Sequence, residues 1–273
     1  MPLQNLWSEI PAEVPFVPLP IHPYTATLVA ALLLFGGVLA GIVGRALGSR
    51  RIRWATVLLV VGALVVQAGA IAQSAATTAG TLPDSSDASL YIAALTTGAA
   101  LASILALVAL ALVARAPRAG AVIGLTIGAI AAGPWLAALI VPFGTTPEGM
   151  PPLLALVQWV PPVLAGLAIA WAGLGTVGRV IAGIVAVILV WVGPAVQTGI
   201  GYSLGSRVLW NDPAGMVEAA VQVFGLALLT PELAWRPIVA CVVTAALGLG
   251  IRTLVARRRT GGTSAAEEGL RHA

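Results

Sequence analysis

The chain has 273 residues, of which 59% are hydrophobic and 9% are charged, and its formal net charge is +4. A soluble domain carries about 25% charged residues, so this composition excludes a soluble globular protein and predicts a polytopic helical membrane protein. All 14 basic residues are arginines, which excludes a retinal or pyridoxal Schiff base because both need a lysine amine. Cys241 is the single cysteine, so no internal disulfide can form. The positive charge is not interpreted as nucleic-acid binding.

Taken in order, the chain begins with a polar, proline-rich segment, residues 1–23, which lacks the basic and apolar regions of a signal peptide. Seven apolar stretches follow, and each is long enough to cross about 30 Å of hydrocarbon. They cover residues 24–45, 54–78, 90–114, 119–143, 153–176, 180–201 and 237–256. The pattern predicts an all-α fold with seven transmembrane helices in a domain spanning 24–256. The polar tail, 257–273, is predicted to be disordered.

The arginines predict the orientation of these spans in the plasma membrane. Twelve of the 14 follow the first, third, fifth and seventh spans, and only Arg207 and Arg236 fall on the other side. By the positive-inside rule the arginine-rich side is cytoplasmic. We therefore expect the N-terminus outside the cell and the C-terminus inside. Most of the acidic residues fall on the outer side, in agreement.

Residues 214–230 are apolar enough to suggest an eighth span. An eighth crossing would place the arginines 257–259 outside, against the same rule. The segment instead carries an apolar helical stripe through Val217, Val221 and Phe224 and a more polar one through Glu218 and Gln222. This pattern predicts an extracytoplasmic amphipathic helix, either lying on the outer surface or re-entering the membrane.

Prolines interrupt three consecutive spans at a similar depth in the outer half of the membrane. They are Pro134, the pair Pro161 and Pro162, and Pro194. Each proline lacks an N–H and so releases a backbone carbonyl. In lipid a released carbonyl needs a partner, either protein or water in a cavity. The common depth predicts a shared irregular region that opens outward.

Amide and aromatic side chains occur at the same level. The predicted ligand-binding residues are Gln73, Trp135, Gln158, Trp159 and Gln197, with Glu218 on a covering segment. Such a lining suits a small apolar or neutral solute or a lipid. The alternative is structural: prolines kink helices without function, glutamines join helices by hydrogen bonds, and tryptophans anchor spans at the interface.

Glycines at four-residue spacing also mark helix packing. Gly120, Gly124 and Gly128 form such a ridge, as do Gly37 and Gly41. Small residues at this spacing let helices approach closely. We expect internal packing, with a surface for another subunit as the alternative.

The sequence offers no catalytic constellation, since neither histidine lies well inside a span and the known hydrolase and metal motifs are missing. We therefore expect no enzyme activity, no metal and no cofactor. Two functions remain open. The first is transport or binding of a small apolar or neutral solute or lipid. The second is a non-catalytic subunit of a larger envelope or transport complex energised by a partner. Besides the lipid bilayer, such a partner would contact the loop arginines Arg45, Arg50, Arg51 and Arg53.

Overall fold

The structure is a computed structural model that describes residues 16–48, 54–80, 82, 86–141, 152–209 and 212–271, with the backbone alone for 86–87, 207, 232–233 and 256–271. The described part is helical and contains no strand. Its elements are the short 3-10 helices η2 (Pro23–Thr25) and η4 (Arg207–Leu209), and α1 (Ala26–Ala46), α2 (Ala55–Ala79), α3 (Ser86–Arg115), α4 (Arg118–Ile140), α5 (Pro152–Val157), α6 (Val160–Ala172), α7 (Val177–Gly205), α8 (Pro213–Leu229) and α9 (Pro231–Arg271).

Seven helical segments of the described chain are long and apolar enough to cross a membrane, with α5 and α6 counted as one. Their exposed surface is also rich in leucine, valine and isoleucine, as expected for helices that face lipid on one side and protein on the other. The predicted all-α class is confirmed for the described residues. By their length and composition, the seven long apolar helices are those of a multi-pass membrane protein.

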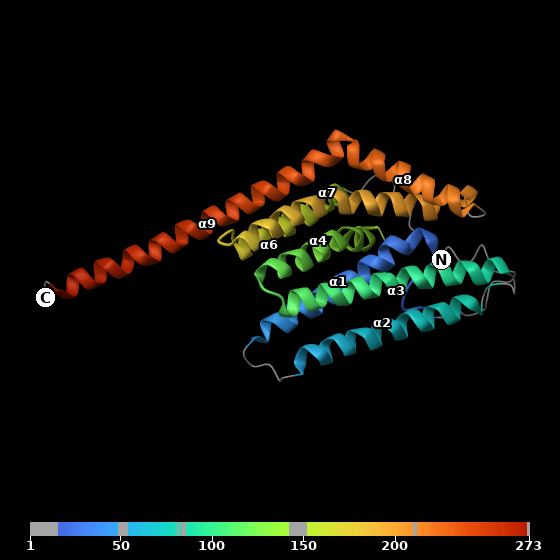
Figure 1. The fold of residues 1–273 in the computed structure, drawn as a ribbon, viewed down its shortest axis with the longest axis horizontal. Coiled ribbons are helices and arrows are strands. Elements are labelled where there is room, and N and C mark those ends of the chain that lie inside the picture. The colour runs from blue at the N-terminus through green and yellow to red at the C-terminus, as the bar shows by residue number, and fades with distance from the viewer. Residues whose placement is uncertain are drawn as a thin grey trace.

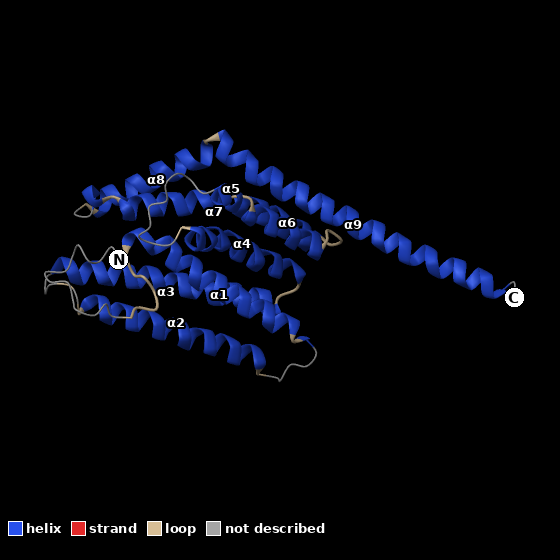
Figure 2. Cartoon of the chain, turned by 180° about the vertical axis from the view of Figure 1, so that it is seen from behind, coloured by secondary structure: helices blue, strands red, loops and turns tan. Residues whose placement is uncertain are grey.

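The helices pack side by side around α1 and α4 (Figures 1 and 2). α1 contacts α3 and α4, and α2 packs mainly on α3 at one edge. On the other side α4 contacts α6 and α7, while α9 packs on α6 and α8 packs on α7. The half formed by α1, α2 and α3 therefore meets the other half mainly along α4, and the two cavities described below lie beside α4.

Both glycine ridges pack against other helices of the same chain. A Cβ on Gly37 would lie 2.7 Å from the carbonyl oxygen of Ala106, and the α1 ridge therefore packs closely on α3. On α4, a Cβ on Gly128 would lie 2.6 Å from Val38 of α1. Gly120 and Gly124 face the end of α3 and the loop that follows it, at 2.6 Å from Ala116 and 2.7 Å from Val113. The α1–α3–α4 interface thus uses all of these glycines internally.

Arginines gather at one end of the bundle, which we call the arginine end and define by Arg45, Arg115, Arg118, Arg179 and Arg252. Arg45 of α1 donates from Nε to the carbonyl oxygen of Val113 at 2.6 Å and from Nη2 to that of Ala116. The last carbonyls of a helix have no partner within the helix. The Arg45 guanidinium therefore caps the C-terminus of α3.

Arg252 of α9 caps α6 in the same way. Its Nη1 donates to the carbonyl oxygens of Ala170 at 3.1 Å and of Trp171 at 2.9 Å. Two further guanidinium groups lie near the Trp171 ring. Its centroid is 5.4 Å from Cζ of Arg45 and 6.0 Å from Cζ of Arg118. Trp171 therefore joins the two halves at the arginine end by cation–π contacts.

The helix predicted over 214–230 is α8, and it runs antiparallel along half of α7. Ser203 Oγ donates to the carbonyl oxygen of Met216 at 2.7 Å near one end, and Trp191 Nε1 donates to that of Leu228 at 3.2 Å near the other. α8 begins with a cap in which the Asp212 carboxylate accepts the N–H of Gly215 at 3.0 Å. α8 thus extends from one end of α7 to its middle.

The chain turns sharply between α8 and α9, and α9 then follows α6 to the arginine end (Figure 1). Beyond the bundle α9 continues as a helix to Arg271, where the sequence predicted a disordered tail from 257. The difference has a local reason, because this segment is rich in arginine, alanine and glutamate, which favour helix, despite its glycine pair.

Candidate functional site

The four prolines singled out in the sequence line one cavity of about 400 Å³, which we call the proline cavity. Its walls come from α4, α6, α7 and the start of α9, with α5 and the turn after it at one side. Pro134, Pro161, Pro162 and Pro194 all belong to it. Helix packing thus brings together residues from three spans that the sequence could compare only by depth.

The prolines do not all interrupt their helices. α4 runs on through Pro134 and α7 through Pro194. The helix is interrupted only between α5 and α6, where Gln158 and Trp159 form a turn. The pair Pro161 and Pro162 then falls in the first turn of α6, where a missing N–H costs no hydrogen bond.

Pro134 and Pro194 lie inside continuous helices, so each leaves the carbonyl four residues before it without its usual helical donor. These carbonyls belong to Ile130 and Val190, and both residues line the proline cavity. The cavity is therefore bordered by two residues whose backbone carbonyls need a partner.

Three of the six predicted ligand-binding residues lie at the proline cavity: Gln158, Trp159 and Gln197. Gln158 uses part of its hydrogen-bonding capacity locally, since its Nε2 donates to the carbonyl oxygen of Ala155 at 2.7 Å. Gln197 belongs to α7 and is half-buried. Amides from the turn between α5 and α6 and from α7 thus border the same space.

The other three predicted residues lie elsewhere. Trp135 stacks on Phe35 of α1, with ring centroids 4.7 Å apart. Gln73 is exposed on α2, away from both cavities described here. Glu218 is exposed on α8 and accepts a hydrogen bond from Gln222 Nε2 at 3.0 Å. The structure does not bring these three to the proline cavity.

The lining residues that the sequence did not single out include Arg236 and Pro237 at the start of α9. The sequence placed Arg236 in an outer loop before the seventh span. Its guanidinium lies 6.0 Å from the centroid of the Trp235 ring. The available signal was the motif Trp235–Arg236–Pro237, which sets another proline beside a charged residue at the start of an apolar run.

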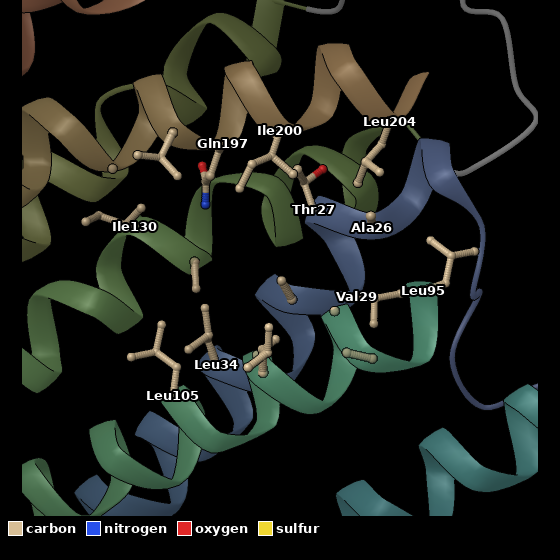
Figure 3. A pocket seen from close by; sticks show the side chains of 18 of the residues that line it. Ala26, Thr27, Val29, Leu34, Leu95, Leu105, Ile130, Gln197, Ile200 and Leu204 are labelled. Carbon is tan, nitrogen blue, oxygen red and sulfur yellow. The ribbon is translucent and has the colours of Figure 1, made fainter. Parts of the chain in front are cut away.

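A second cavity of about 620 Å³, the apolar cavity, lies between α1, α3, α4 and α7. Figure 3 shows the side chains of Leu34, Leu105 and Gln197, from α1, α3 and α7, around its space. Its polar lining side chains are His22, Thr27 and Gln197. The remaining lining residues are alanine, glycine and branched aliphatics, which the sequence cannot distinguish from residues that face lipid.

The two cavities are neighbours along the α4–α7 interface. Gln197 and Ile130 line both of them. A Cβ on Gly193, one turn before Gln197, would lie 2.9 Å from Cδ1 of Ile130. The Ile130 side chain therefore packs on Gly193 between the cavities. Gln197 lies one helical turn further along α7.

Gln67, near the middle of α2, has a structural role. It is buried, its Nε2 donates to the carbonyl oxygen of Leu33 at 3.2 Å, and its Oε1 accepts from Ser103 Oγ at 2.5 Å. This amide joins α1, α2 and α3. Arg45 of the predicted docking loop is likewise engaged within the chain, and Arg50, Arg51 and Arg53 lie outside the described residues.

Among the described residues no three histidine, cysteine, aspartate or glutamate side chains are placed to share a metal ion. No protein-family model, curated protein or solved structure matches the chain.

Proposed function

We propose that this protein binds a small apolar or neutral solute or a lipid within the plasma membrane, at the proline cavity, and moves it across or along the membrane. One observation carries the proposal: prolines from three spans line one cavity, and Ile130 and Val190, whose carbonyls Pro134 and Pro194 release, line it too. Such carbonyls are tolerated in a membrane only where protein, water or a ligand can bond them.

The proposed orientation places this cavity in the outer half of the membrane. If the arginine end is cytoplasmic, Pro161 lies about three turns of α6 away from it, which is ~16 Å along the helix axis. That depth is beyond the middle of a hydrocarbon layer of about 30 Å. A ligand would then enter from the outer leaflet or the outer surface.

The lining chemistry supports a ligand with few charges. Apolar side chains and amides make up most of the proline cavity, with Arg236 at its edge as the charged side chain. No carboxylate side chain lines either cavity within the described residues. We therefore propose that the proline cavity holds its ligand by apolar contacts and hydrogen bonds.

Native mass spectrometry of the protein, extracted gently from its own membrane into lipid discs, tests the proposal. Wild-type protein should carry a bound small molecule or specific lipid. Gln197→Leu should retain ~5- to 10-fold less of it, since a lost hydrogen bond is worth about 1 kcal/mol. Gln73→Leu is the matched control, because it makes the same change at an exposed amide of α2.

Equal occupancy in wild type, Gln197→Leu and Gln73→Leu would place the ligand elsewhere on the protein. A wild-type protein free of any specific small molecule would count against the binding function itself. A stoichiometric protein partner in the same spectra would favour the role of a complex subunit instead.

A further inference from the structure

We infer that the proline cavity and the apolar cavity form one site for an anionic amphiphilic lipid, with the headgroup oxyanion at Arg236 and the chain in the apolar cavity. The inference rests on the proposed function and narrows its ligand. It follows from the depth of Arg236, from the chemistry of each cavity and from the two residues that line both.

Arg236 lies near one end of the apolar span of α9, two residues after Ala234, where that span begins. It precedes Arg252, which caps α6 at the arginine end, by about four and a half turns of α9, or ~24 Å along the helix axis. Its side chain is exposed and borders the same cavity as the prolines. In a hydrocarbon layer about 30 Å thick, a guanidinium at the end of a span reaches the headgroup region, where lipid phosphates lie.

The proline cavity matches a phosphate headgroup that also carries hydroxyls. A guanidinium binds phosphate or carboxylate oxygens through paired N–H donors. The amides of Gln158 and Gln197 both donate and accept, and the residues with released carbonyls offer acceptors for hydroxyl groups. A glycerol phosphate group supplies both kinds of partner, whereas a neutral hydrocarbon supplies neither.

The apolar cavity matches the chain of such a lipid. It follows α7 from Leu189 to Leu204, about four turns or ~22 Å. Leu101 and Leu105 of α3 and Ile200 of α7, which line it, are exposed on the surface of the bundle. In a membrane these residues meet lipid, so a chain can enter sideways without crossing water.

The two cavities adjoin at Gln197 and Ile130, because both residues line both cavities. The headgroup and the chain of one lipid would therefore meet beside Gln197. The polar side chain there would lie at the junction of head and chain, where the ester groups of a lipid accept hydrogen bonds.

The experiment uses the full-length protein in lipid discs that contain phosphatidylglycerol, phosphatidylcholine or diacylglycerol, and native mass spectrometry counts the retained lipids. Wild-type protein should retain phosphatidylglycerol at least about tenfold over diacylglycerol. Arg236→Gln should abolish this preference and still retain both lipids. Arg236→Lys should keep part of it, since the charge remains without the planar fork.

A second pair of variants tests the chain site. Gly98 lines the apolar cavity, and a Cβ there would meet nothing within 4 Å. Gly98→Leu should therefore fill the cavity and reduce retention of both lipids at least about fivefold. Gly69→Leu is the matched control, because Gly69 of α2 is equally open and lies outside both cavities.

An unchanged preference for phosphatidylglycerol in Arg236→Gln would overturn the inference. If Gly98→Leu still reduced the retention of both lipids, the proposed function would stand. If neither Arg236→Gln nor Gly98→Leu changed lipid retention, the proposed function would fail as well.

Discussion

Gly193 of α7 lies directly against Ile130 of α4, and a Cβ there would approach Cδ1 of Ile130 to 2.9 Å and Cγ2 to 3.2 Å. The contact lies where the proline cavity and the apolar cavity adjoin. It also fixes how closely α4 and α7 pack. Real Cβ atoms rarely come this near another carbon, so an alanine at 193 would force Ile130 to move.

Gly193→Ala should destabilise the protein by about 1–2 kcal/mol, because overpacking exceeds the gain in helix propensity. Ile130→Val removes Cδ1 and should relieve the collision. Unfolding measurements on both single variants and the double variant give the coupling, which should be favourable by at least ~0.5 kcal/mol. Strictly additive effects would show that the two side chains do not interact.

The helical class and the number of spans were predictable because both depend on the length and hydrophobicity of each apolar run. Span number follows from the length of each run and from the thickness of the membrane, and all seven spans appear as helices. The position of α8 was also visible, since Asp212 and Pro213 are typical of a helix start. Its packing along α7 was not predicted, because nothing in its sequence specifies which helix it contacts.

The sequence predicted the depth at which the site residues lie in the membrane, but not which way each helix turns them. Pro134, Pro161 and Pro194 could be placed at one level from their distance to the span ends. Their convergence depends on the rotation of each helix, which the nearly uniform apolar faces do not reveal. For the same reason Gln73 was grouped with Gln197, although it is exposed on α2 at the edge of the bundle. Arg236 was missed because charge counting treats every arginine near a span end as a loop residue.

The buried amide of Gln67 leads to a prediction about stability. Gln67→Leu should lower the free energy of unfolding by about 1–2 kcal/mol, because it removes hydrogen bonds to Leu33 and Ser103 at a buried position. Reversible unfolding in mixed detergent micelles measures this difference. Gln73→Leu changes an exposed amide on the same helix and should alter stability by less than ~0.5 kcal/mol. Equal effects at the two positions would contradict the structural role of Gln67.

The cap at the end of α6 gives a second prediction about stability. Arg252→Ala removes the donors to the carbonyl oxygens of Ala170 and Trp171. We expect a loss of about 1–2 kcal/mol, since hydrogen bonds from charged donors are the stronger kind. Arg179→Ala, at the same end of the bundle, is the control. The same unfolding assay compares the two variants, and a larger loss for Arg179→Ala would show that general surface charge matters more than the cap.

The arginine loop between α1 and α2 predicts how a cytoplasmic protein partner, if one exists, would be released. Arg45 is engaged with the C-terminus of α3, so its replacement would disturb the fold and the partner together. Arg50 and Arg51 are therefore the residues to reverse. If the loop docks a partner, the double variant Arg50→Glu and Arg51→Glu should lose it in a pull-down from the native membrane, while its melting temperature stays close to that of the wild type. Arg45→Glu should lower the melting temperature whether or not a partner is present, because it places a carboxylate among the carbonyls of α3. Full recovery of a partner with the Arg50 and Arg51 variant would leave lipid headgroups as the natural counterpart of this loop.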